Sequence, residues 1–192
     1  MDNNKAEEMN WRKAVAFLLR LASIGDPGGL REGDRINLLD DFRRFLELQD
    51  EVDVKQELDA ARNDPAKLAP AIEVVRKLAN AAADHTRAEI HVGETRVVFD
   101  GARMDVKGER APVSIDGKLR DVMASTAAMD LGLAKPWQIG RCQRTECGKL
   151  FLADRKGQMY CSHKCATAVS SAKYHEREKA KKAGKKNKRG VK

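Results

Sequence analysis

Apolar residues in the first half of the chain recur about every 3.6 residues, the repeat of an amphipathic helix. Three such stripes lie between residues 8 and 85: Val15, Leu18, Leu19 and Ala22; Leu38, Phe42, Phe45 and Leu46; Leu68, Ile72, Val75, Leu78 and Ala82. A Gly- and Pro-rich stretch at residues 25–30 separates the first two stripes. Asp64 before Pro65 resembles a helix start, but Pro70 is expected to delay the third helix. The pattern predicts three or four packed helices.

From residue 90 the apolar period changes to two, which is typical of half-buried strands. The alternating positions are Ile90 and Val92, Val97 and Phe99, Met104 and Val106, and Val113 and Ile115. Gly- and Asp-containing pairs between them favour tight turns, so a small antiparallel meander is expected. A last amphipathic helix, with Leu119, Val122, Thr126 and Met129 on one face, should end near Gly132. The predicted fold class is α+β.

All four cysteines lie in one short stretch near the C-terminal end. Cys142 and Cys147 bracket four residues, and Gly148 allows a tight turn after the second. Cys161 and Cys165 are four apart, so a helix beginning near Ser162 would place both on one side of its first turn. Residues 150–160, "LFLADRKGQMY", read as a strand, a turn at residues 154–157 and a second strand. Knuckle, hairpin and helix together predict a treble-clef-like site.

One structural zinc ion bound by Cys142, Cys147, Cys161 and Cys165 suits this spacing best. An iron–sulfur cluster is an alternative, as are disulfides or cysteines without a ligand. His163, between the last two cysteines, is expected on the helix surface. A closed four-thiolate site leaves no open position for water, so catalysis at the metal is not expected.

Other chemistry finds little support in the sequence. It contains no Gly-rich phosphate loop, no nucleophile elbow and no His-Glu-x-x-His motif, and the chain is predicted not to be an enzyme. His85, Glu89 and His91 are a weaker candidate metal site, because a helix end and a strand should separate the two histidines. The chain has no apolar run long enough for a bilayer and no signal-peptide pattern, so a cytoplasmic location is expected.

Positive charge is concentrated at the C-terminal end. Of 37 basic and 29 acidic residues, ten basic and two acidic lie in residues 166–192, which leaves 27 of each in residues 1–165. A basic helix from Ser162 to about Lys182, with Val169 and Tyr174 turned toward the finger, predicts contacts with nucleic-acid phosphates. A solubilising tail is the simpler alternative. The expected nucleic-acid contacts are Lys164, Lys173, Arg177, Lys181, Lys182, Lys185, Lys186, Lys188 and Arg189.

Residues 137–180 resemble the CGNR-type zinc finger at the C-terminus of bacterial transcription regulators. The matching positions are Trp137, Arg141, Cys142, Cys147, Phe151, Asp154, Tyr160, Cys161, Ser162, Cys165 and Tyr174. Where that family has Cys-Gly-Asn-Arg this chain has Cys165 followed by Ala166, Thr167 and Ala168, so the roles of the family's Asn and Arg are not carried over. Family members usually carry an N-terminal domain called ABATE, and the helix, meander, helix order of residues 8–133 is similar to it.

These observations divide the chain into residues 1–135, an N-terminal domain with its own core; residues 136–182, the finger and its basic helix; and residues 183–192, a disordered basic tail. The predicted function is that of a zinc-binding transcription regulator that contacts duplex DNA, while the N-terminal part senses a small molecule or mediates homodimerisation. Few Arg and Asn side chains could read bases, so phosphate contacts are expected to dominate. The alternative is a zinc-stabilised protein-interaction or RNA-binding module.

Overall fold

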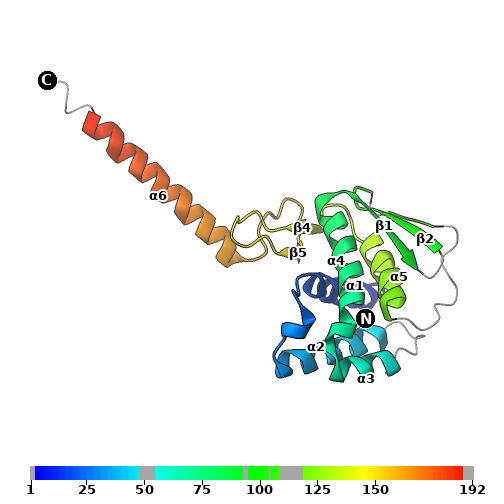
Figure 1. Ribbon diagram of the computed structural model, residues 1–192. Coiled ribbons are helices and arrows are strands. Elements are labelled where there is room, and N and C mark those ends of the chain that lie inside the picture. Colours follow the sequence, from blue (N-terminus) through cyan, green and yellow to red (C-terminus); the bar gives the residue numbers. More distant parts are fainter. Residues whose placement is uncertain (1–2, 48–54, 93–94, 104, 109–118, 188–192) are drawn as a thin grey trace.

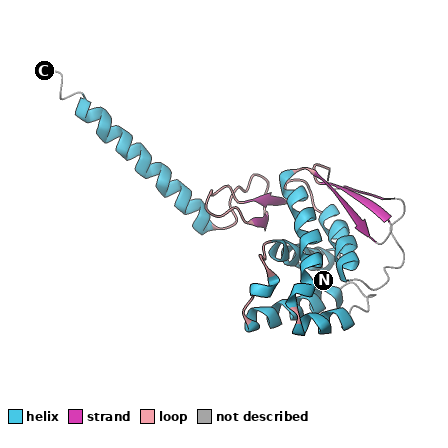
Figure 2. Ribbon diagram, in the orientation of Figure 1, coloured by secondary structure: helices cyan, strands magenta, loops and turns pink. Residues whose placement is uncertain are grey.

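The computed structural model describes residues 3–47, 55–92, 95–103, 105–108 and 119–187. These residues form a helical body with a small sheet along one side, and a long helix, α6, that projects away from the body (Figure 1). Figure 2 shows that helices dominate and that the strands are short. The predicted α+β class is confirmed. Within the described residues, no helix combines the length and apolarity needed to cross a membrane.

The first two helices are joined by a short turn. Helix α1 (Asn3–Ala22) and helix α2 (Glu32–Glu47) are separated by a short 3-10 helix, η1 (Pro27–Gly29). The side chain of Asp26 caps η1 by accepting a hydrogen bond from the Gly28 amide at 2.9 Å. The predicted stripes of both helices are buried, apart from Leu46, whose side chain lies outside the described part.

Helix α4 (Ala69–Asp84) lies at the centre of the body, against α1 and the last helix of the body. It follows helix α3 (Lys55–Asn63) and a 3-10 turn, η2 (Pro65–Leu68). The third helix therefore starts downstream of Asp64, as Pro70 in its first turn predicted. All five apolar positions of the predicted third stripe are buried.

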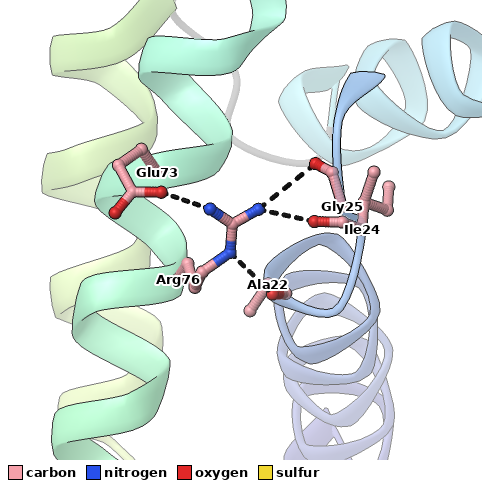
Figure 3. A network of polar contacts seen from close by, with 5 residues as sticks. All are labelled: Ala22, Ile24, Gly25, Glu73 and Arg76. Atoms are coloured by element: carbon pink, nitrogen blue, oxygen red, sulfur yellow. Dashed lines mark hydrogen bonds and ion pairs between the residues drawn. The ribbon is translucent and has the colours of Figure 1, made fainter. Parts of the chain in front are cut away.

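Arg76 of α4 connects this helix to the end of α1 (Figure 3). Its Nε donates a hydrogen bond to the Ala22 carbonyl at 3.2 Å, and one Nη donates to the Ile24 and Gly25 carbonyls at 2.5 and 3.4 Å. The other Nη pairs with Glu73 on the same helix. Carbonyls at a helix C-terminus have no intrahelical partner, so the guanidinium of Arg76 supplies the hydrogen bonds that the end of α1 lacks. Its positive charge also interacts favourably with the negative end of the helix dipole.

The meander is a three-stranded antiparallel sheet in the order β1 (Arg87–Val92), β2 (Thr95–Asp100) and β3 (Asp105–Gly108). The register pairs Ile90 with Val97 and Phe99 with Val106, so these four positions lie on one face of the sheet. Met104, another predicted position, lies outside the described residues. The predicted fourth strand, around Val113 and Ile115, lies outside the described residues.

Helix α5 (Leu119–Gly132) ends where the sequence predicted. Glu57 of α3 accepts a hydrogen bond from the Leu119 amide at 2.6 Å and so caps this helix. Leu119, Val122 and Thr126 are buried as expected, but Met129 is 49% exposed, so its predicted place in the core was wrong. Contacts with both α4 and β1 widen the buried face to include Met123, Ala127 and Leu131, and Met129 lies on the remaining open side.

The core continues beyond the helices into a two-stranded hairpin. Strand β4 (Ile139–Arg141) pairs antiparallel with strand β5 (Leu150–Leu152). Ile139, only 1% exposed, belongs to the same apolar cluster as the helical body, and Leu150 and Leu152 pack against that cluster. The core therefore passes residue 135, where the first domain was predicted to end; independent folding of residues 1–135 stays a prediction.

Two local predictions near the C-terminal end were wrong. Residues 158–160 form no strand. The Gln158 side chain accepts from the Asp154 amide at 3.0 Å and donates to the Tyr160 carbonyl at 3.1 Å. The Met159 carbonyl accepts from the Gln143 amide at 3.0 Å. Helix α6 (His163–Asn187) continues past the predicted end at Lys182 and through Gly184, so residues 183–187 are helical. Residues 188–192, the rest of the predicted tail, lie outside the described part.

Candidate metal centre

The first two cysteines lie in a tight knuckle that joins β4 to β5. Cys142 directly follows β4, and its amide donates to the Lys149 carbonyl at 2.9 Å, which closes the loop. The amides of Cys147 and Gly148 both donate to the Arg144 carbonyl, at 2.8 and 3.2 Å. Gly148 has a left-handed backbone (φ +55°), the conformation that glycine adopts without a steric penalty. The loop therefore turns back on itself and brings the sulfurs of Cys142 and Cys147 close to those of Cys161 and Cys165.

The second pair of cysteines lies at the start of α6. Ser162 precedes the helix, and its hydroxyl accepts a hydrogen bond from the Cys165 amide at 3.3 Å, an N-cap contact. Cys161 lies just before this cap and Cys165 lies in the first turn. The positive end of the helix dipole favours ionised thiolates at these positions. The predicted helix start near Ser162 is confirmed.

The four sulfurs converge on a volume that suits one metal ion. All four Sγ atoms lie within 4.8 Å of one another, and the Cys147–Cys161 and Cys161–Cys165 Sγ distances are both 3.7 Å. Four sulfurs at about 2.3 Å from a tetrahedral zinc ion would be about 3.8 Å apart. A disulfide would need about 2.05 Å, and the cysteines are free thiols. The four cysteines are therefore positioned to hold one metal ion.

Thiols this close together cannot all ionise easily unless a cation is present. Burial and the neighbouring thiols raise the pKa of Cys161 to about 12. The Ser162 hydroxyl, the leading cause, lowers the pKa of Cys165 to about 7. Arg144, in the knuckle, pairs with Glu146 at 2.5 Å, and Glu146 and the nearby Cys165 raise the pKa of its guanidinium. Metal binding must release the remaining thiol protons.

A second apolar cluster surrounds the sulfurs. Phe151 and Ala153 are buried beside Cys142 and Cys165, and Trp137 and Tyr160 cover the cluster from the sides. Cys147 and Cys161 are half-buried. Partial exclusion of water strengthens the interaction of thiolates with a bound cation and stiffens the centre.

Polar contacts attach the finger to the helical body. Arg141, next to the first cysteine, donates to both carboxylate oxygens of Asp84 at 3.2 and 3.0 Å and to the Asn80 side chain at 2.9 Å, both on α4. It also donates to the Gly148 carbonyl of the knuckle at 3.3 Å. On the other side, Arg12 of α1 pairs with Asp154. The finger is therefore attached to both α1 and α4.

The structure describes the side chains of only some of the predicted nucleic-acid contacts. Lys164, Lys173, Arg177 and Lys181 are exposed on α6, where Lys181 pairs with Glu178 at 3.0 Å. Lys182, Lys185 and Lys186 belong to α6, but their side chains lie outside the described part, as do Lys188 and Arg189 altogether.

The predicted packing of α6 on the finger is confirmed only in part. Val169 is half-buried, whereas Tyr174 is 62% exposed, because the helix has left the finger by that turn (Figure 1). Tyr174 stacks edge-on against His175 instead. His163 is exposed, as predicted. The body of the finger therefore supports only the first turns of α6.

The weaker candidate site does not form. His85 ends α4 in a left-handed conformation (φ 54°), with Nδ1 3.5 Å from the Gly101 carbonyl. Across the described ranges, the four cysteines are the only group of three or more metal-ligating side chains that come together.

Sequence reasoning missed the contacts of Arg141 with Asp84 and of Arg12 with Asp154. No local signal could have found either ion pair, because the partners meet only when the finger packs on α4 and α1. No known protein-family model matches the sequence, and neither does any curated protein. The resemblance to the CGNR-type finger stays a prediction that depends on the matched residues.

Proposed function

We propose that the four cysteines hold one structural zinc ion and that the chain binds nucleic acid, specifically duplex DNA, through α6. The observation that carries this proposal is the shape and charge of α6: a 25-residue helix that begins at the metal ligands and leaves the body (Figure 1). The proposed role is that of a DNA-binding regulator in the cytoplasm, without enzymatic activity.

The sulfur geometry supports zinc. Soft thiolate ligands in a closed tetrahedral set suit Zn²⁺, and a sulfur spacing of 3.7 Å fits a single ion. An iron–sulfur cluster places several atoms between its cysteines, so it needs a wider separation of the sulfurs. With all four positions filled by protein sulfur, the metal would have no site for substrate.

The charge of α6 supports phosphate binding. From residue 163 to residue 187 the helix has eight basic and two acidic residues, a net charge of +6. No ion pair within the described chain involves Lys164, Lys173, Arg177 or Lys179. Free cations on an exposed surface can exchange the counterions of DNA for direct phosphate contacts, and the released ions favour binding.

The isolation of α6 supports a macromolecular partner. A helix of this length extends for about 37 Å, at 1.5 Å per residue. Single helices in water are of marginal stability unless they pack against something. Beyond Val169 the described side chains of α6 are almost all exposed, so a partner that covers the helix would stabilise it. The zinc centre would then fix the direction in which the helix leaves the body.

Salt-dependent binding of fluorescently labelled duplex DNA tests this proposal. The double variant Arg177→Gln/Lys179→Gln should weaken binding and lower the slope of log K against log salt by about 1.8, since each phosphate contact contributes about 0.9. The matched control Arg62→Gln/Lys67→Gln removes two exposed cations from the body and should leave the slope unchanged.

The same binding measurements with single-stranded DNA and structured RNA, each at a low and a high salt concentration, identify the preferred nucleic acid. If the intact protein bound all three no better than an unrelated basic peptide of equal charge, the proposal would be wrong. The finger would then be better explained as a protein-interaction module.

A further inference from the structure

A cleft of about 730 Å³ lies between α1 and α2, away from the cysteines. Its walls include Lys13, Phe17 and Arg20 from α1 and Arg44 and Phe45 from α2. Pockets that bind small molecules typically have volumes of about 300–1,000 Å³ and combine apolar walls with a few polar groups. The cleft has the size and the mixture of side chains of such a site.

Aromatic rings form the base of the cleft. Phe17 packs against Phe45 with ring centroids 4.9 Å apart and meets Phe42 edge-on at 5.4 Å. All three rings are buried. Phe17 and Phe45 line the cleft, and Phe42 supports Phe17 from the core, so the two lining rings present a fixed apolar surface. Ala14 and Ala16 continue this surface along α1.

The charges of the cleft are not balanced. Arg20 pairs with Asp41 and lies over the Phe17 ring at 5.9 Å, so its charge is compensated. Lys13 and Arg44 are exposed, and no carboxylate in the described ranges pairs with either. Among the described lining residues there are three cations and one carboxylate, so two positive charges face the cleft without a carboxylate partner in that part of the chain.

The helical spacing separates the two ends of the cleft. Lys13, Phe17 and Arg20 follow one another at intervals of four and three residues, so they share one face of α1. Lys13 and Arg20 are about 10 Å apart along the axis, at 1.5 Å per residue. Phe17 therefore lies between the neutral Arg20–Asp41 pair at one end of the cleft and the cation of Lys13 at the other.

We propose that this cleft binds a small amphipathic carboxylic acid. Its carboxylate accepts charge-assisted hydrogen bonds from Lys13 and Arg44, and its apolar body lies over Phe17 and Phe45. The apolar base selects against small hydrophilic anions such as phosphate, and the two free cations select against neutral apolar compounds. The site gives the helical body a ligand class of its own, separate from the nucleic-acid surface on α6.

Isothermal titration calorimetry of the full chain with 2-naphthoate tests the site. The acid should bind, and the uncharged analogue 2-naphthylmethanol should bind at least about tenfold more weakly, because it lacks the charged acceptor. The variant Lys13→Gln/Arg44→Gln should weaken 2-naphthoate binding by at least about tenfold. The matched control Arg62→Gln/Lys67→Gln should bind it like the unmodified chain.

A second variant tests the location by shape instead of charge. Ala16→Trp places an indole in the cleft from an exposed position and should abolish 2-naphthoate binding while circular dichroism stays unchanged. The proposal is overturned if the acid and the alcohol bind equally, if neither binds, or if both cleft variants bind the acid normally. Duplex-DNA binding by the same variants separates this result from the proposed function, because none of the changed residues lies on α6.

Discussion

Replacing Ile139 with alanine is expected to destabilise the helical body, although Ile139 belongs to the hairpin that carries the first cysteines. Its side chain is 1% exposed and belongs to the core cluster of the helices. Truncating a buried isoleucine to alanine costs about 2–5 kcal/mol, from lost burial and from the cavity that remains. For a chain of 192 residues, a loss of about 3 kcal/mol lowers the melting temperature by about 6–12 °C.

Thermal unfolding followed by circular dichroism measures this effect. Leu133→Ala is the control, because it removes an apolar side chain that is 72% exposed and should change stability by less than about 0.5 kcal/mol. A chain that ends at residue 135 lacks Ile139, Leu150 and Leu152, so it should melt below the full chain by at least as much as the variant. Equal melting of Ile139→Ala and Leu133→Ala would show that β4 is not part of the core.

Three further predictions concern the body. Gly101→Ala should cost more than about 2 kcal/mol in urea unfolding, because its Cβ would lie 2.0 Å from the Ala81 carbonyl oxygen, whereas Gly25→Ala meets nothing within 4 Å and should be nearly neutral. Arg76→Ala should cost about 1–2 kcal/mol in the same assay, since the Ile24 and Ala22 carbonyls lose their donor; an unchanged urea midpoint would contradict this. Burial raises the pKa of Asp130 from its ordinary 3.8 to about 6, and its Oδ2 has no hydrogen-bond partner, so this group's contribution to stability falls as pH rises from about 4 to about 6. Asp130→Asn should therefore stabilise the chain by up to about 3 kcal/mol above pH 6 and by less near pH 4, and melting curves with no such pH dependence would refute the assignment.

The helices and the cysteine pairs could be predicted from the sequence because their signals are local. The stripes of α1 and α4 follow from apolar spacing alone, and Ser162 before Cys165 is an ordinary N-cap signal. The knuckle could be placed because Cys147 is followed by a glycine that tolerates the left-handed turn.

The parts that could not be predicted depend on neighbours far away in the sequence. Met129 fits an apolar stripe, but whether it is buried depends on which sides of α5 other elements cover. Leu150–Leu152 could pair with strand-like residues on either side, and the register with β4 depends on the core position of Ile139. The cleft between α1 and α2 arises only from the packing of the two helices.

Native mass spectrometry of the purified chain tests the central claim most directly, because it counts the metal and identifies it in one measurement. The account predicts one zinc ion per chain, bound with loss of thiol protons, and loss of that ion when any one of Cys142, Cys147, Cys161 and Cys165 is replaced by serine. A chain whose mass showed no metal, two disulfides or an iron–sulfur cluster would contradict it, and α6 would then have no zinc centre to fix its direction.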